Sequence, residues 1–311
     1  EEVHERWGGV VPELASRRHL ETLLPVVKEA LSQAGIGYGD LGAVAVTNRP
    51  GLIGSLIVGV NAAKAIAWAQ GIPLIPVNHL EAHLAAVTLE GATLEWPCLG
   101  LIISGGHTSL YEIHDDWREF RPIGHTRDDA AGEAFDKGAR LLGLPYPGGP
   151  NVARLAAKGN PQAVNFPRAL PGKDTLDFSF SGLKTSVHTW LQKNPVTEAQ
   201  MPDVCASLQE AIVDALVAKS VLAVRERRAR DLVVAGGVAS NQRLREKLRE
   251  ELPEFCRLHV PQPRFCTDNG AMIAAMGAIR FRQGAVLREE EIFSAPISPR
   301  TEAKDARGKF K

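Results

Sequence analysis

The feature that most constrains the fold of this 311-residue chain is an alternation of short apolar segments with longer helical ones. Residues 41–47 form a short apolar run that ends at a Pro-Gly turn, and residues 54–70 then carry small and apolar side chains at helical spacing. Residues 74–77 form a second run that leads directly into another helix. Residues 232–235 form a third, followed by a Gly-Gly turn and a charged helix. Strands that alternate with helices predict mixed α/β layers.

Several other segments are predicted from local patterns. Residues 99–104 and 108–113 are apolar runs on either side of a Gly-Gly-His turn, which predicts a β-hairpin. Residues 128–137 are expected to form an acidic amphipathic helix. Residues 144–182 are rich in proline and glycine, which predicts an ordered, loop-rich insertion.

Composition limits the classes of function. A hydrophobic content of 44% fits a soluble globular protein, and the length allows two lobes with separate cores. Lys plus Arg and Asp plus Glu both number 36, so an RNA contact has to come from a local patch. The four cysteines lack C-x-x-C spacing and no signal peptide is recognisable, so we expect a reducing cytosol. Residues 51–69 are apolar but include Asn61 and Lys64, which predicts a buried helix rather than a membrane span.

The most distinctive chemical pattern is the pair His79 and His83. On a helix, residues four apart lie on one face, so both imidazoles can bind one metal ion. In the zinc-protease pattern a glutamate directly follows the first histidine, whereas Glu81 lies midway and is expected to point to the opposite side. The pair therefore predicts a metal site without a hydrolytic base. Asp268 is a candidate third ligand, although either Thr267 or Asp268 could simply be the N-cap of the helix that follows.

Three glycine-bearing turns are candidate nucleotide sites. The turn from Ser104 to Gly106 lets a phosphate approach backbone amides, although an ordinary hairpin turn has the same pattern. The turn around Gly149 is expected to form a wall against a ribose or base, or a plain loop. The Gly-Gly turn after residue 235 opens a helix capped by Ser240 or Asn241, where the Asn241 amide could contact a nucleotide. Late in the acidic helix, Asp136 could accept hydrogen bonds from ribose hydroxyls.

Seven segments in order resemble one known family. They are GGVVPELASRRH (8–19), NHLEAH (78–83), LIISGGHTSL (101–110), DDAAGEAFDKGARLLGLPYPGGP (128–150), DFSFSGLKT (177–185), AGGVASN (235–241) and TDNGAM (267–272). Together they are similar to the tRNA N6-adenosine threonylcarbamoyltransferase family, formerly called O-sialoglycoprotein endopeptidases. The resemblance implies transfer of a threonylcarbamoyl group from threonylcarbamoyl-adenylate to N6 of the adenosine after the anticodon, in tRNAs that read codons beginning with A.

The resemblance also implies the two-lobed fold of actin, heat-shock ATPases and sugar kinases, with the active site between the lobes. We expect residues 1–98 in the first lobe, residues 99–270 in the second, a helix near 271–290 packing back on the first, and a tail from 291 to 311. Family members normally begin with a strand and phosphate turn upstream of the GGVVPE segment. This amino-terminal hairpin is expected to be missing here, with a loss of central strands from the first lobe.

The functional residues implied by the resemblance coincide with those chosen from the patterns. The implied metal ligands are His79, His83 and Asp268, with iron as the usual metal and zinc as the other. The implied nucleotide contacts are Ile102, Ile103, Ser104, Gly105, Gly106, Asp136, Gly149 and Asn241. The implied companions, besides tRNA, are a noncatalytic paralogue of the same fold and an ATPase subunit, with no membrane partner.

Other functions and surfaces remain open from the residues alone. A metalloprotease would use the histidine pair, a small-molecule kinase would use the glycine turns, and a non-enzymatic nucleotide-binding subunit would use neither for catalysis. Basic side chains that could contact RNA, or form solvated helix faces, occur in three clusters. They are Arg225, Arg227, Arg228 and Arg230; Arg243, Arg245, Lys247 and Arg249; and Lys304, Arg307, Lys309 and Lys311.

Overall fold

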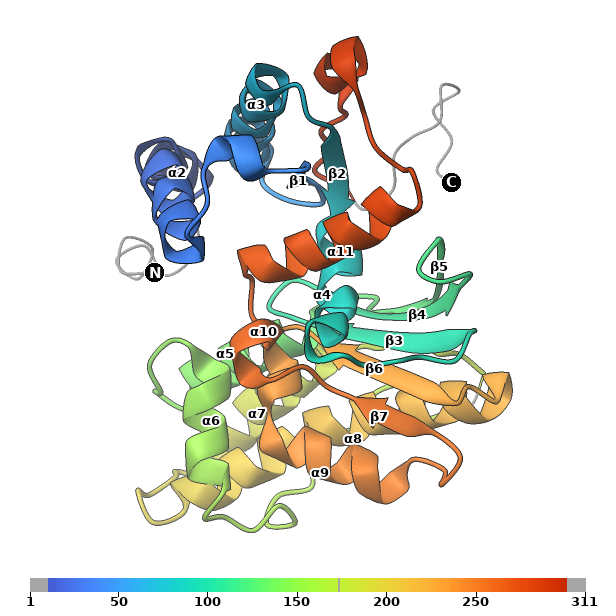
Figure 1. Cartoon of the computed structure of the whole chain (residues 1–311). Coiled ribbons are helices and arrows are strands. Elements are labelled where there is room, and N and C mark those ends of the chain that lie inside the picture. The colour runs from blue at the N-terminus through green and yellow to red at the C-terminus, as the bar shows by residue number, and fades with distance from the viewer. Residues whose placement is uncertain (1–10, 173, 301–311) are drawn as a thin grey trace. The chain divides into compact units, whose positions relative to one another are not determined.

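A computed structural model describes residues 11–172 and 174–300, so the third basic cluster lies outside the described residues. The chain forms two compact units (Figure 1), one containing the residues up to Ala85 and from Asn269, the other Ala86–Asp268. The sequence placed these boundaries near 98 and 270. Residues 86–98 go with the second unit because Glu90 accepts a hydrogen bond from the Gln262 amide at 3.0 Å and Asp231 accepts one from the Glu95 amide at 2.7 Å.

The first unit is built around two parallel strands. Strand β1 (Val44–Arg49) pairs with β2 (Leu74–Asn78), with α3 (Ile53–Gln70) between them in sequence. The predictions of both strands and of the helix between them are confirmed. The remaining elements of this unit are α2 (Pro12–Ala34), η1 (Tyr38–Asp40), α4 (His79–Ala85), α11 (Gly270–Arg282) and η4 (Glu289–Ser294). The second unit begins with η2 (Ala86–Glu90).

The last described segment belongs to the core of the first unit. Ile292 and Ala295 are buried against Val60 of α3 and Leu74 of β2. The Asn48 side chain also donates a hydrogen bond to the Pro296 carbonyl at 3.0 Å. The expected tail therefore begins with packed residues. Helix α11 ends at Arg282, earlier than expected, and two residues later the left-handed Gly284 turns the chain away.

The second unit contains a five-stranded sheet in the order β5-β4-β3-β6-β7. The hairpin prediction is confirmed, because β3 (Cys98–Ile103) and β4 (Thr108–His114) pair antiparallel. Strands β3, β6 (Asp231–Ala235) and β7 (Arg257–His259) are parallel, and β5 (Glu119–His125) forms the other edge. Long helix α8 (Met201–Arg227) lies beside the sheet with α9 (Gln242–Glu251) packed on it (Figure 1). The other helices are α5 (Ala131–Leu141), α6 (Gly148–Ala156), α7 (Ser181–Lys193), η3 (Gly237–Ser240) and α10 (Pro263–Cys266).

Two predictions in this unit were wrong in detail. The acidic helix begins at Ala131 and not at Asp128, because the Asp128 carboxylate accepts hydrogen bonds from the Phe180 and Ser181 amides at 2.7 and 3.2 Å at the start of α7. The insertion predicted as loops contains helix α6. Its proline, Pro150, lies in the first turn, where a missing N–H breaks no helical hydrogen bond.

The prediction of a buried helix at residues 51–69 was only partly right, because most residues of α3 are exposed or half-buried. Helix α3 buries one face, which includes Leu56 and Val60, while Trp68 on the same helix is exposed. Among the described helices, none has the length and apolar character needed to cross a membrane. All four cysteines are free and buried. Burial raises the pKa of Cys98 to about 12 and that of Cys205 to about 11, which keeps both as thiols at neutral pH.

Candidate functional site

Helix α4 begins at the end of a buried strand. The Asn78 carboxamide oxygen accepts a hydrogen bond from the Leu80 amide at 2.9 Å, which satisfies one of the free amides at the start of the helix. Leu80 and Leu84 are buried and fix the rotation of the helix. His79 and His83 are also four residues apart, so their imidazoles share a face of the helix next to the one that carries Leu80 and Leu84.

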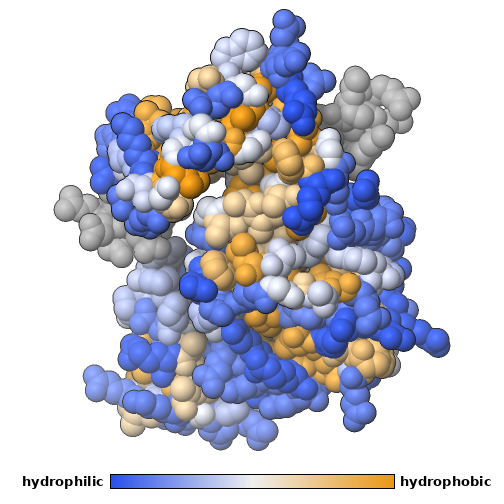
Figure 2. All heavy atoms as spheres, in the orientation of Figure 1, coloured by the Kyte–Doolittle hydropathy of each residue, from blue (hydrophilic) through white to orange (hydrophobic). Residues whose placement is uncertain are grey.

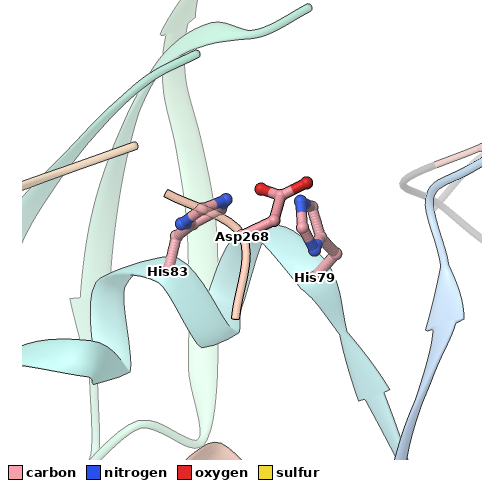
Figure 3. A group of neighbouring side chains, drawn as sticks. All are labelled: His79, His83 and Asp268. Carbon is pink, nitrogen blue, oxygen red and sulfur yellow. The ribbon is translucent and has the colours of Figure 1, made fainter. Parts of the chain in front are cut away.

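Three candidate metal ligands converge at this face. The ligand atoms of His79, His83 and Asp268 all lie within 4.8 Å of one another. The two imidazole rings meet edge to face with their centroids 4.6 Å apart. Figure 3 shows the Asp268 carboxylate directed toward the space beside both rings. The fold thereby brings together residues that are nearly two hundred positions apart in the sequence.

Asp268 reaches the histidines because of the helix that follows it. Asn269 is the N-cap of α11, and its side chain accepts a hydrogen bond from the Met272 amide at 2.9 Å. The prediction that Thr267 or Asp268 caps this helix is therefore wrong by one or two positions. Helix α11 lies close on β1, since a Cβ at Gly277 would stand 2.5 Å from the Ala45 Cβ. Asp268 directly precedes this anchored helix.

Glu81 forms a structural ion pair and is not available as a catalytic base. Its carboxylate accepts a hydrogen bond from the Arg280 guanidinium at 2.7 Å, in an ion pair whose side chains are mostly buried. Glu81 is therefore engaged with α11 and is not a member of the metal-ligand group. The pair joins α4 to α11 and so helps to set the distance between the histidines and Asp268. Sequence reasoning missed Arg280, because no local pattern shows which basic residue pairs with Glu81.

The donor set fits a catalytic metal ion. Two imidazole nitrogens and one carboxylate oxygen are ligands that zinc and non-haem iron accept, and three protein ligands leave coordination positions for a substrate. His83 is buried, His79 is intermediate and Asp268 is exposed, so one side of the group is open to solvent. These residues can hold a metal ion.

The Ser104 turn connects β3 to β4 in the second unit. The Ser104 hydroxyl accepts a hydrogen bond from the His107 amide at 3.1 Å, and the Ser104 amide donates to the His107 carbonyl at 2.8 Å. Gly105 and Gly106 are exposed at the tip of this closed turn. Ile102 and Ile103 are fully buried in β3, so these two residues can approach a ligand only through their backbones.

The Gly236 turn lies beside the end of β3. Gly236 has a φ of +94°, and a Cβ there would stand 2.4 Å from the Ile103 carbonyl oxygen. Asn241 caps α9, as its side-chain oxygen accepts from the Leu244 amide at 3.1 Å, which decides between the two predicted caps. The Asn241 amide nitrogen donates to Gln209 at 2.8 Å. Its side chain is thus held in a fixed orientation beside the turn.

Asp136 and Gly149 lie at the junction of α5 and α6. The Asp136 carboxylate accepts a hydrogen bond from the Gly148 amide at 2.7 Å. Burial raises the pKa of Asp136, and the Gly148 and Gly149 amides oppose that shift. Gly148 has no room for a side chain, because a Cβ would stand 2.6 Å from the Asp136 Cα. Asp136 therefore fixes the start of α6, which carries Gly149.

The glycines of these turns fall into two groups. Gly148 and Gly236 are required by the protein's own packing, as is Gly132, whose Cβ would stand 2.6 Å from the Ser104 carbonyl oxygen. By contrast, a Cβ at Gly105 or Gly106 would meet nothing within 4 Å, and neither has a left-handed backbone. Within the described residues, the fold gives no reason for glycine at Gly105 and Gly106. Space at these positions remains available to a ligand.

Comparison with known proteins bears on the fold and the chemistry. The family model described as tRNA N6-adenosine threonylcarbamoyltransferase matches residues 1–275. A protein of that name from Anaeromyxobacter sp. (strain Fw109-5) is 54% identical over 286 residues, which cover 91% of this chain and 86% of the relative. Another of the same name, from Geotalea uraniireducens (strain Rf4), is 48% identical over 301 residues, covering 96% of this chain and 87% of the relative.

Solved structures extend the comparison to the fold. T. kodakarensis HypF aligns with 86% of this chain and 44% of its own, with a TM-score of 0.59 and 15% sequence identity. At that identity the likeness concerns the fold alone. It confirms the predicted actin-like ATPase fold.

Proposed function

Since this chain belongs to the tRNA N6-adenosine threonylcarbamoyltransferase family, we propose that it transfers a threonylcarbamoyl group to the N6 amine of an adenosine in tRNA. The donor is threonylcarbamoyl-adenylate, and the acceptor is the adenosine after the anticodon in tRNAs that read codons beginning with A. The N6 nitrogen attacks the carbamoyl carbon and forms the new C–N bond. The bond from that carbon to the phosphate oxygen breaks, AMP leaves with the electron pair, and the amine proton passes to solvent.

His79, His83 and Asp268 hold one divalent metal ion in this proposal. The support is their convergence within 4.8 Å, with one side of the group open to solvent. The nitrogen-rich donor set suits iron, which we propose as the native metal, with zinc as the alternative. A bound ion would supply Lewis acidity toward oxygens of the donor.

The second unit binds the adenylate part of the donor. The Gly105 and Gly106 residues are exposed, and the absence of side chains there permits close approach of a phosphate to the backbone. The Gly106 amide already donates a long hydrogen bond to the Ser104 hydroxyl at 3.4 Å, so the Gly105 amide is the proposed donor to a phosphate oxygen. Ser104 closes this turn, and the backbones of Ile102 and Ile103 lead into it. Asp136, Gly149 and Asn241 are the proposed contacts to the ribose and base. Because the donor is an activated anhydride, holding and orienting it are the main demands on these residues.

Protein hydrolysis is disfavoured by the ion pair of Glu81 with Arg280, which removes the only acidic residue between the two histidines from the role of base. A kinase would give the histidine pair no role. We further propose a cytoplasmic location, which the four free cysteines support, and assembly with a noncatalytic paralogue and an ATPase subunit.

Nucleoside mass analysis of tRNA tests the function. Unmodified tRNA is incubated with this protein and threonylcarbamoyl-adenylate, with and without the companion subunits. We expect threonylcarbamoyladenosine to appear, and to disappear after removal of metal by a chelator. A protein that binds the adenylate and yields no modified nucleoside with its companions present would instead be a nucleotide-binding subunit.

A further inference from the structure

One basic cluster remains outside the proposed site and carries exposed positive charge. Helix α8 ends at Arg227, and the chain then passes through Arg228 and Arg230 into strand β6. Arg225, Arg228 and Arg230 line one open depression together with Phe255, which comes from the segment between α9 and β7. All four residues are exposed.

The charges in this depression are poorly neutralised. Among the described residues, neither Arg225 nor Arg228 makes an ion pair, and Arg230 meets only Glu95, at 3.3 Å, with both side chains largely in solvent. Such an exposed ion pair contributes little to stability and leaves the guanidinium available to bind a phosphate. The chain as a whole has a formal charge of zero, so a polyanion can be attracted only by a local excess of this kind.

The neighbouring cluster on α9 is different. Arg243 forms two hydrogen bonds with Glu210, both at 2.9 Å, and Lys247 contacts Glu210 and Asp214. Arg245 donates to the Ala239 carbonyl at 2.6 Å. The face over α9 is strongly hydrophilic in Figure 2. Nevertheless, three of the four basic side chains in this cluster form ion pairs or hydrogen bonds with other residues of the protein. The two clusters look equivalent in sequence and differ in available charge.

Two further features suit a nucleic acid. Phe255 is 51% exposed and lies beside guanidinium groups. An exposed aromatic ring next to arginines can stack on an unpaired base while the arginines contact phosphates. In addition, Arg228 has a φ of +49°, a conformation that an arginine adopts at some cost and that glycine would adopt freely.

The position of the depression fits a large substrate. Arg230 precedes the first residue of β6, whereas the Gly236 turn follows its last residue. A five-residue strand spans about 16 Å, a distance that a folded RNA can bridge.

We propose that the depression lined by Arg225, Arg228, Arg230 and Phe255 is a docking surface for RNA. This surface contacts the backbone phosphates and one unstacked base of the tRNA substrate. This inference rests on the proposed function for the identity of the RNA. The arginines contribute phosphate contacts, and the phenyl ring contributes stacking.

The test measures binding of tRNA to the full chain by fluorescence anisotropy over a range of salt concentrations. The variant combines Arg225→Ala with Arg228→Gly, and the control combines Arg249→Ala with Lys193→Ala, which removes two exposed charges elsewhere in the same unit. Each lost phosphate contact lowers affinity by about tenfold at 0.1 M salt and reduces the salt slope by about one. We therefore expect about a hundredfold weaker binding for the variant and little change for the control.

Folding and stacking are checked separately. Glycine relieves the left-handed backbone at position 228, so the melting temperature of the variant should not fall through that change. Phe255→Ala should weaken binding about tenfold while the salt slope stays the same. Unchanged tRNA affinity in the double variant, an equal loss in the control, or equal competition by poly-glutamate and poly-uridylate would overturn the proposal.

The two proposals fail in different ways. Wild-type protein that binds tRNA through Arg225 and Arg228 but forms no threonylcarbamoyladenosine would contradict the proposed reaction and leave the docking surface standing. Conversely, normal product formation by the double variant, with an unchanged KM for tRNA, would contradict the docking surface alone.

Discussion

The metal-ligand group and the glycine turns are built in opposite ways. The metal-ligand group depends on particular side chains, which helix α4 and the segment before α11 bring within 4.8 Å of one another. The glycine turns depend on backbone and empty space at the ends of β3 and β6, which are neighbours in one sheet. The first arrangement should be sensitive to a change of chemical group, and the second to the addition of a single methyl group.

The largest expected effect follows from removal of a metal ligand. His83→Ala should lower threonylcarbamoyl transfer by at least about a hundredfold, because a two-ligand site neither retains the ion nor positions it. Elemental analysis should show loss of metal from the purified protein. The matched control is His188→Ala, an exposed histidine of α7, which should keep both metal and rate. Full activity of the His83 variant with bound metal would contradict the proposed ligand set.

Alanine substitutions can distinguish a glycine that the fold requires from one that only ligand binding requires. Gly236→Ala should destabilise the protein by about 2–4 kcal/mol, since the new Cβ would overlap the Ile103 carbonyl oxygen in a left-handed backbone. Gly106→Ala should change stability by less than about 0.5 kcal/mol and weaken adenylate binding, because only a ligand needs that space. Denaturant unfolding and equilibrium binding measure the two effects. Tight adenylate binding by the Gly106 variant would remove this turn from the proposed site.

A smaller effect is expected from the ion pair that joins α4 to α11. Arg280→Gln leaves Glu81 without its charged partner and loosens the helix that follows Asp268. Metal affinity should fall about tenfold, as for other groups that support metal ligands indirectly, while adenylate binding stays constant. Arg282→Gln, an exposed position on the same helix, is the control. Equal metal affinity in both variants, measured by competition with a chelator, would show that the ion pair does not position the site.

Local patterns predicted much of the fold. The strands near 41–47, 74–77 and 232–235 and the hairpin around Gly105 were recognised from apolar runs and glycine turns, which depend on neighbours in sequence. Errors occurred where a distant partner decides the outcome. Asp128 was assigned to its own helix because the sequence does not show that its carboxylate caps α7, about fifty residues later. Likewise, the sequence of helix Gly148–Ala156 resembled that of a loop because its first three residues are Gly, Gly and Pro.

The sequence by itself determined the residue types of the site and the helical spacing that puts His79 and His83 on one face. Only the tertiary structure decided that Asp268 meets them, that Glu81 is paired with Arg280, and which arginines stay available on the surface. The reason is the range of the interactions. Helical and strand periodicity act between residues a few positions apart, whereas convergence and charge neutralisation depend on which surfaces pack together when apolar side chains leave water.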